Sequence, residues 1–300
     1  MVDNFGRLAA EKLDQYIDPL DAPQRTIKLL ERVIVGEGWA QGVNAKTLAA
    51  ESHSTFERFL LKRISAAAES RRLLSFEFSS ETTTVVQGSC FIFESDGQEI
   101  AEYKRQRSNA LPMLQTVQDL SPREFEFLCG VILAKLGVEE PFISPSSNDQ
   151  GVDFFGKAAF GDLVKKTVLP DAVEENLKIW IVGQAKRKND TKVGTSDLRE
   201  LVGSVELARS KIYSSDSEVL EGLSLRLCDP VFSIIVCSGR FTKGSETLLG
   251  KAGIIGLDGI QLCQFLSDHG VGNGDDGFER ELLLSEIRSM EQRVQFIKSE

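Results

Sequence analysis

Apolar residues recur with helical or strand-like spacing along the chain, and these two periods predict its elements. In the first third, helical spacing predicts helices at about 4–17, 22–35, 44–51 and 55–74, the last two separated by the polar break Ser52-His53-Ser54. Two apolar segments, 74–78 and 83–94, then predict a hairpin. Helices followed by a two-stranded ribbon are typical of a winged helix-turn-helix, and no less of a structural or dimerising extension.

The second half alternates helices with apolar strands. A helix is predicted to start after Ser121, because Pro122 occupies its first position and Glu124 completes a capping box; Gly137 ends it. Strands are then predicted at 151–156, 179–186, 230–237 and 253–258, and helices at 196–213, 243–251 and 259–269. This order indicates an α/β fold with a mixed sheet flanked by helices.

A polar, partly basic segment at 106–118 is predicted to connect two domains. We expect a helical or α+β N-terminal domain at 1–110, which the winged helix-turn-helix would occupy, and an α/β domain at 119–270. A charged amphipathic helix at 277–300 follows a break rich in Gly and Asp.

Polar residues interrupt two predicted strands where a buried strand should be apolar. Asp153 lies in the first, and Gln184 and Lys186 lie in the second. Such groups must be satisfied locally or take part in chemistry, since burying them unpaired is costly. Asp153 capping a turn, or pairing with Lys186 without catalysis, is the alternative to a reactive site.

The composition restricts which ligands and metal sites the protein can have. The formal net charge is −10, which is the wrong sign for coating nucleic acid, so DNA would need a local basic patch such as 186–188. With two histidines and five scattered cysteines, a metal would have to be held by oxygen ligands. No apolar run approaches the roughly 20 residues of a membrane span and the start lacks a signal-like pattern, so we expect a cytoplasmic protein.

Five motifs in order resemble those of the Mrr-type restriction endonucleases, within the PD-(D/E)xK nuclease superfamily. The resemblance spans about 120–266 and implies a restriction-endonuclease-like αβ core. The motifs are Ser-Pro-Arg-Glu-Phe-Glu at 121–126, Asn-Asp-Gln-Gly-Val-Asp at 148–153, Gln-Ala-Lys-Arg at 184–187, Val-Cys-Ser-Gly-Arg-Phe-Thr at 236–242 and Ile-Gly-Leu-Asp-Gly at 255–259.

The resemblance implies a catalytic site that hydrolyses DNA phosphodiester bonds with Mg²⁺, for which Mn²⁺ would substitute. Asp153 would be the central metal ligand, and the carbonyl of Ala185 would complete a shell of oxygen ligands. Lys186 would orient the attacking water or stabilise the oxyanion. Glu126 would reach the metal through water, and Gln184 stands where many relatives outside this branch have Glu or Asp.

Four further residues are expected to contact DNA: Arg187, Lys188, Ser238 and Thr242. The alternatives are a solvated strand end for Arg187 and Lys188 and strand-end turns for Ser238 and Thr242. The expected setting is restriction or anti-phage defence, with the N-terminal domain recognising a DNA feature or mediating a homo-oligomer or a partner defence protein. A segment at 158–176 extends the connection between Asp153 and Gln184 beyond a tight hairpin. The alternatives are a catalytically silent nuclease-like module that binds DNA or protein, and an effector that a partner activates.

Overall fold

Secondary structure gathers into two units along the chain. The structure, a computed structural model, describes residues 2–79, 83–145, 151–159, 177–211 and 222–297. Internal contacts define the units as residues 1–112 with 275–277, and residues 113–274 with 278–300. None of the helices in the described ranges combines the length and the apolar character that a membrane crossing needs.

The first unit packs helices against a small antiparallel sheet. β3 is the central strand and pairs with both β1 and β2, so the predicted hairpin is present, with a second strand shorter than 83–94. Leu30, Phe56 and Val86 lie fully buried in the shared core. In chain order the elements are α1 (Val2–Lys12), a 3₁₀ turn (Leu13–Gln15), β1 (Gln24–Arg25), α2 (Thr26–Gly36), α3 (Gly42–Glu69), β2 (Phe76–Phe78), β3 (Val85–Gly88) and α4 (Gln98–Ser108).

The predicted break at Ser52-His53-Ser54 is wrong, because α3 runs through it. Ser52 is fully buried where α1 meets α3. A Cβ added to Gly6 of α1 would lie 2.6 Å from the carbonyl oxygen of Ser52. The small residues therefore permit close approach of two helix backbones and do not end the helix.

The predicted connection at 106–118 is also helical, since α4 continues to Ser108 and α5 spans Ala110–Asp119. Ala110, Met113 and Val117 are buried at helical spacing, whereas Pro112, Gln115 and Asp119 are exposed. Gln115 thus lies on the exposed face of a helix. The segment 106–118 is too short for its apolar periodicity to predict that helix.

The second unit contains a five-stranded mixed sheet in the order β4-β5-β6-β7-β8. β4 pairs with β5 and β5 with β6 in antiparallel fashion, whereas β6, β7 and β8 are parallel. β4 was not predicted. The elements are α6 (Pro122–Lys135), β4 (Phe142–Ile143), β5 (Phe154–Ala159), β6 (Lys178–Lys186), α9 (Thr195–Arg209), β7 (Val231–Cys237), α10 (Lys243–Ala252), β8 (Ile255–Leu257), α11 (Gly259–Asp268), β9 (Asn273–Gly274), β10 (Gly277–Phe278) and α12 (Arg280–Ile297).

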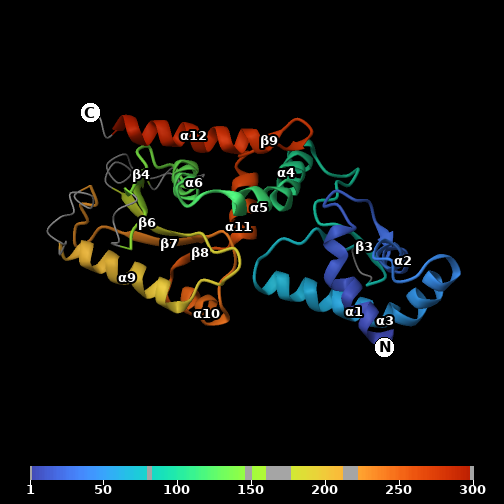
Figure 1. Ribbon diagram of the computed structural model, residues 1–300. Helices are drawn as coiled ribbons and strands as arrows, with labels where there is room; N and C mark the ends of the chain where they lie inside the picture. The colour runs from blue at the N-terminus through green and yellow to red at the C-terminus, as the bar shows by residue number, and fades with distance from the viewer. Residues whose placement is uncertain (1, 80–82, 146–150, 160–176, 212–221, 298–300) are drawn as a thin grey trace. The chain divides into compact units, whose positions relative to one another are not determined.

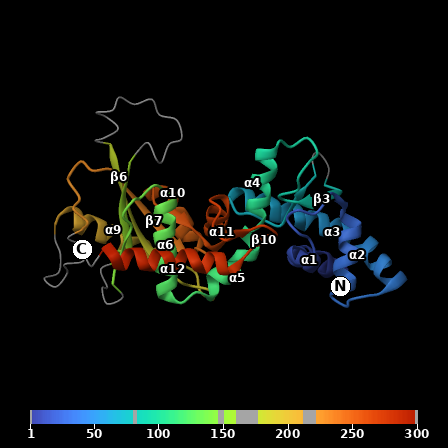
Figure 2. The same cartoon turned by 90° about the horizontal axis from the view of Figure 1, so that it is seen from above.

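Helices cover both faces of this sheet, which confirms the predicted α/β class. α6 lies on one face and α9 with α10 on the other (Figure 1). α12 packs against α6 and crosses it, as Figure 2 shows from above. The predicted capping box at Ser121 and Glu124 is present, and Gly137 has the positive φ of +83° expected after a helix end.

The sheet register brings the two predicted polar strands side by side. Phe154 pairs with Gly183 at the start of β5, so Asp153 lies next to the end of β6, close to Gln184 and Ala185. Motif residues 148–150 and most of the predicted connection, 160–176, lie outside the described residues.

Candidate active site

Asp153 is held at the start of β5 by backbone hydrogen bonds on both sides. Its N–H donates to the carbonyl of Gly183 at 2.9 Å, and its carbonyl accepts from the N–H of Ser144 at 2.8 Å. The side chain turns toward β6, where Oδ2 accepts a hydrogen bond from the N–H of Ala185 at 2.7 Å. The carboxylate is therefore fixed one residue away from Lys186.

Burial raises the pKa of the Asp153 carboxyl above its ordinary value. The hydrogen bond from Ala185 opposes this rise, the negative charge of Glu126 adds to it, and the positive charge of Lys186 lowers it again. The net rise in pKa means that hydrogen bonding and nearby positive charge do not fully stabilise the ionised Asp153 carboxylate. Its surroundings favour the arrival of a cation.

Glu126 comes to the site from α6. Its Oε2 accepts a hydrogen bond from Arg123 Nη1 at 2.6 Å, and the same nitrogen donates to the carbonyl of Ser144 at 2.7 Å. Arg123 thus connects Glu126 to the residue whose N–H binds the Asp153 carbonyl. Sequence reasoning missed this role, although an Arg and a Glu three positions apart on a helix are a recognisable pair.

The thiol of Cys129 on α6 lies close enough to Asp153 and Glu126 to interact with their charges. Cys129 follows Glu126 by one turn of α6 and is fully buried. Burial raises the pKa of this thiol well above its ordinary value, and the charges of Asp153 and Glu126 raise it further. The thiol therefore stays protonated, so it adds apolar packing and no charge.

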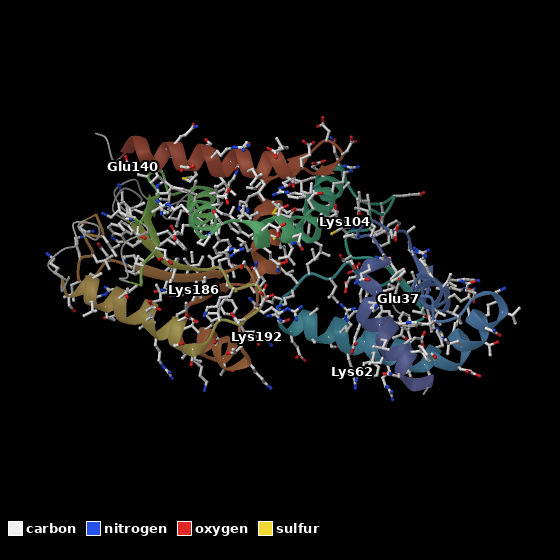
Figure 3. All side chains as sticks on the ribbon, in the orientation of Figure 1. Glu37, Lys62, Lys104, Glu140, Lys186 and Lys192 are labelled. Carbon is white, nitrogen blue, oxygen red and sulfur yellow. The ribbon has the colours of Figure 1, made fainter. Side chains whose placement is uncertain are left out.

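Gln184 and Lys186 project from the same face of β6, toward α9, because alternate residues of a strand share a face. The orientation of the buried Gln184 amide that suits its neighbours places Oε1 3.0 Å from Lys186 Nζ and Nε2 3.2 Å from the carbonyl of Asp197. Lys186 lies between the sheet and α9 (Figure 3).

The ion pairs of Lys186 are made with α9. Its Nζ lies 3.2 Å from Glu200 Oε2 and 3.7 Å from Asp197 Oδ1. Among the described residues, no ion pair within 4.0 Å joins Lys186 to Asp153, so a direct pair between these two is not what satisfies Asp153. Asp197 and Glu200 were missed from the sequence, where they read as ordinary solvated residues of an amphipathic helix.

The residues predicted to contact DNA divide into two groups. Arg187 is exposed and its Nη2 donates to the carbonyl of Gln118 at 3.2 Å. Lys188 is half-buried, and its Nζ lies 3.0 Å from Asp197 Oδ2. Both cations directly follow Lys186 at the end of β6 that carries the site.

The other two have local structural roles. Ser238 is fully buried: its Oγ donates to Asn189 Oδ1 at 2.7 Å and accepts from the N–H of Lys188 at 3.0 Å. Thr242 caps α10, where its Oγ1 accepts from the N–H of Ser245 at 3.1 Å. The Ser238 hydroxyl makes both of these hydrogen bonds within the protein.

The donor set fits a hard divalent cation. Within the described ranges, no three His, Cys, Asp or Glu residues gather into a metal-binding cluster. Mg²⁺ does not need one, since it is commonly bound by one or two carboxylates with water and substrate phosphate. Asp153 and Glu126 provide two carboxylates whose mutual repulsion a cation would relieve.

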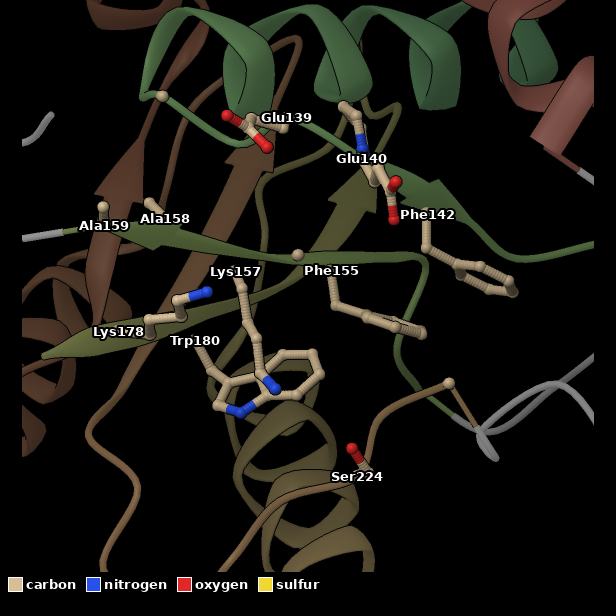
Figure 4. A pocket seen from close by; sticks show the side chains of 14 residues that line it. Glu139, Glu140, Phe142, Phe155, Lys157, Ala158, Ala159, Lys178, Trp180 and Ser224 are labelled. Atoms are coloured by element: carbon tan, nitrogen blue, oxygen red, sulfur yellow. The ribbon is translucent and has the colours of Figure 1, made fainter. Parts of the chain in front are cut away.

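A separate cavity of about 520 Å³ lies near the other end of β5 and β6 (Figure 4). Phe142 and Phe155 stack there with ring centroids 4.4 Å apart, and Lys157 Nζ lies 4.5 Å from the Trp180 ring centroid. None of the predicted site residues lines it. The candidate active site is therefore a polar edge of the sheet and not this cavity.

Solved structures of three restriction endonucleases resemble the chain at low sequence identity. They are MspJI in complex with a 27-mer oligonucleotide (18% identity, TM-score 0.41, 68% of this chain and 43% of that chain), the DNA modification-dependent AspBHI (10%, 0.41, 61% and 40%) and FokI (8%, 0.34, 89% and 44%). In each case the match spans less than half of the longer relative.

Comparison with curated proteins found no match. A comparison with family models matches residues 117–215 to the Mrr catalytic domain, described as a restriction endonuclease. The match begins before α6 and includes Glu126, Asp153, Gln184 and Lys186. The chain therefore contains, at residues 117–215, a restriction endonuclease domain of the Mrr family.

Proposed function

We propose that the protein is a Mg²⁺-dependent endonuclease that cleaves DNA in the cytoplasm, in restriction or anti-phage defence, and that Mn²⁺ substitutes for Mg²⁺. One observation carries the proposal. The Asp153 carboxylate accepts a hydrogen bond from the N–H of Ala185, one residue before Lys186, and Glu126 raises the pKa of that carboxyl. Two acids and one lysine thus converge within a domain that matches a nuclease family.

Asp153, Glu126 through water, and the carbonyl of Ala185 would hold the metal, with Gln184 beside them. When bound, Mg²⁺ supplies Lewis-acid stabilisation of the charge that builds on the phosphoryl oxygens. The chain itself supplies the ammonium group of Lys186, which donates to the attacking water or to a phosphoryl oxygen. Arg123 keeps Glu126 oriented through the hydrogen bond at 2.6 Å.

Two cations at the end of β6, the exposed Arg187 and the half-buried Lys188, would hold the DNA backbone near this site. Arg187 and Lys188 follow Lys186 directly, and their local positive charge offsets the formal net charge of −10. Contacts of this kind provide affinity without sequence readout and weaken with salt. Cleavage specificity would then depend on the first unit or on the target's shape.

The first unit would supply recognition as a winged helix-turn-helix. Its order α1-β1-α2-α3-β2-β3, with β3 between β1 and β2, supports this assignment. Lys46, Arg58 and Lys62 are exposed on α3, the helix that would enter a groove. The same unit would serve for self-association or for binding a partner defence protein.

The test is plasmid cleavage by the full-length protein on methylated and unmethylated DNA, with Mg²⁺, with Mn²⁺ and with EDTA. The expected result is cleavage that EDTA abolishes and that Asp153→Ala and Lys186→Ala each reduce by about a hundredfold or more. Undiminished cleavage in either variant, or in EDTA, would overturn the assignment.

A second candidate is a nuclease-like module that binds DNA or protein without cutting. It is favoured by the ion pairs that occupy Lys186, which must rearrange before that side chain meets a substrate. This candidate predicts binding without cleavage in either metal, with an affinity that Asp153→Asn does not change.

A further inference from the structure

The first turn of α9 carries an acid that contacts three residues of the β6 end. Asp197 Oδ2 lies 3.0 Å from Lys188 Nζ, and Oδ1 lies 3.7 Å from Lys186 Nζ. The main-chain carbonyl of Asp197 accepts from the Gln184 amide at 3.2 Å. Asp197 thus contacts the side chains of Gln184, Lys186 and Lys188, which project from the same face of β6 and of the residues that follow it.

Asp197 is itself held rigidly. Its Oδ2 accepts from the N–H of Gly194 at 2.9 Å, which fixes the side chain against the start of α9. Its side chain is 13% exposed, whereas that of Glu200, the other partner of Lys186, is 46% exposed. An ion pair of a largely buried, anchored carboxylate restrains a lysine, whereas a pair with an exposed side chain contributes little.

Lys186 needs such a restraint because its four-carbon side chain is flexible and its ammonium is strongly hydrated. Gln184 adds a second contact, since its Oε1 lies 3.0 Å from Lys186 Nζ, and Asp197 in turn holds Gln184. Two of the three contacts that converge on the ammonium therefore depend on Asp197, one through its carboxylate and one through its carbonyl; the third is the pair with the exposed Glu200.

We propose that Asp197 is a positioning residue for the Lys186 ammonium group. This rests on the proposed function, in which Lys186 acts at the scissile phosphate. Asp197 does not touch the substrate; it sets where Lys186 points before DNA binds. Glu200, which is solvated, is the matched residue that pairs with the same ammonium without this role.

The experiment compares Asp197→Asn, Asp197→Glu and Glu200→Gln in the full-length protein. Asn keeps an acceptor for the Gly194 N–H but removes the charge, so α9 keeps its start. Plasmid cleavage yields kcat and KM for DNA, and thermal unfolding verifies the fold. Lysine ammonium ¹H–¹⁵N spectra report the order of Lys186, whose signal is assigned by its loss in Lys186→Arg.

Asp197→Asn is expected to lower kcat about 10–100-fold with KM changed less than about threefold, and to remove the Lys186 ammonium signal. Asp197→Glu should restore kcat to within about fivefold, and Glu200→Gln should stay within about threefold of wild type. Wild-type kcat in Asp197→Asn, an equal loss in Glu200→Gln, or a retained ammonium signal overturns the proposal.

Two outcomes separate this proposal from the proposed function. If wild-type protein does not cleave, the nuclease assignment fails, and the ammonium signal alone decides the position of Lys186. If Asp197→Asn does not fold, Asp197→Glu decides: an ordered Lys186 signal with near-normal kcat supports the proposal, and a wild-type kcat with a disordered signal overturns it.

Discussion

The N–H of Ala185 donates a hydrogen bond at 2.7 Å to Oδ2 of Asp153, a carboxylate whose pKa burial nevertheless raises. A carboxyl with a raised folded-state pKa binds more protons in the folded protein than in the unfolded chain. Stability is therefore greatest below the unfolded pKa and falls as the pH rises through the folded value. At neutral pH the ionised side chain destabilises the fold.

Asp153→Asn should therefore stabilise the metal-free protein at pH 7 while abolishing cleavage. Asn keeps an oxygen acceptor for the Ala185 N–H but carries no buried charge. Urea unfolding between pH 3 and 8 in EDTA measures the difference, which should shrink to zero as the pH falls below the unfolded pKa. Equal stabilisation at all pH values would contradict this account.

Asp229 is a control for which we expect the opposite change in stability, because its carboxyl pKa is lowered and not raised. Burial opposes its ionisation, but hydrogen bonds from Arg226 and from Trp180 Nε1 lower the pKa of its carboxyl overall. A lowered folded pKa gives stability that is present above the unfolded pKa and is lost as the pH falls through the folded one. Asp229→Asn should destabilise the protein at pH 7 by about 1–3 kcal/mol, with the deficit disappearing in acid. A stability loss in Asp229→Asn that persists in acid would show that the ionised carboxylate is not the source of the stabilisation.

The sequence predicted the candidate site residues on the two strands, but it did not predict the acids of α9 that contact Lys186. Asp153, Gln184 and Lys186 were found because a polar residue in an apolar strand is anomalous, and the register of β5 with β6 brings them together. Asp197 and Glu200 could not be found this way, because charged residues are ordinary on an amphipathic helix. Their contacts with Lys186 exist only through the packing of α9 on β6.

The same limit applies to two residues elsewhere. Ser52 resembled a helix break, but burial against α1 makes it a helix-packing residue. The prediction that Ser238 contacts DNA followed from the position of its loop on the same side of the sheet as the site, and the hydrogen bond of Ser238 to Asn189 could not be predicted in that way. Local pattern predicts where elements lie, and tertiary packing decides which polar groups remain available.

Glu126→Gln should lower the cleavage rate about 10–100-fold and raise the Mg²⁺ concentration needed for half-maximal rate. The charge that supports the metal is lost, while the amide oxygen still accepts from Arg123. Initial rates across a Mg²⁺ titration measure both effects. Glu124→Gln is the matched control, because Glu124 lies on the same turn, where its Oε2 accepts from the Ser121 N–H, and glutamine also serves there. Equal effects of the two substitutions would remove Glu126 from the site.

Gly6→Ala should destabilise the first unit by about 1–3 kcal/mol, because the new methyl group would meet backbone atoms of α3. An added Cβ would lie 2.6 Å from the Ser52 carbonyl oxygen and 2.9 Å from the Phe56 nitrogen, and no side-chain rotation relieves a clash with backbone. Gly203→Ala is the matched control, since an added Cβ meets nothing within 4 Å and lies on an exposed helix position. It should stabilise the second unit by about 0.5–1 kcal/mol.

The two tryptophans make this comparison specific to each unit. Trp39 lies in the first unit, with its ring centroid 5.3 Å from that of Phe5, and Trp180 lies on β6 in the second. In a Trp180→Phe background, urea unfolding followed by Trp39 fluorescence should show the Gly6→Ala loss. In a Trp39→Phe background, Trp180 should report the Gly203→Ala gain. If Gly6→Ala leaves the Trp39 transition in place, α1 and α3 are not packed backbone to backbone at this crossing, and Ser52 has no packing reason to be small.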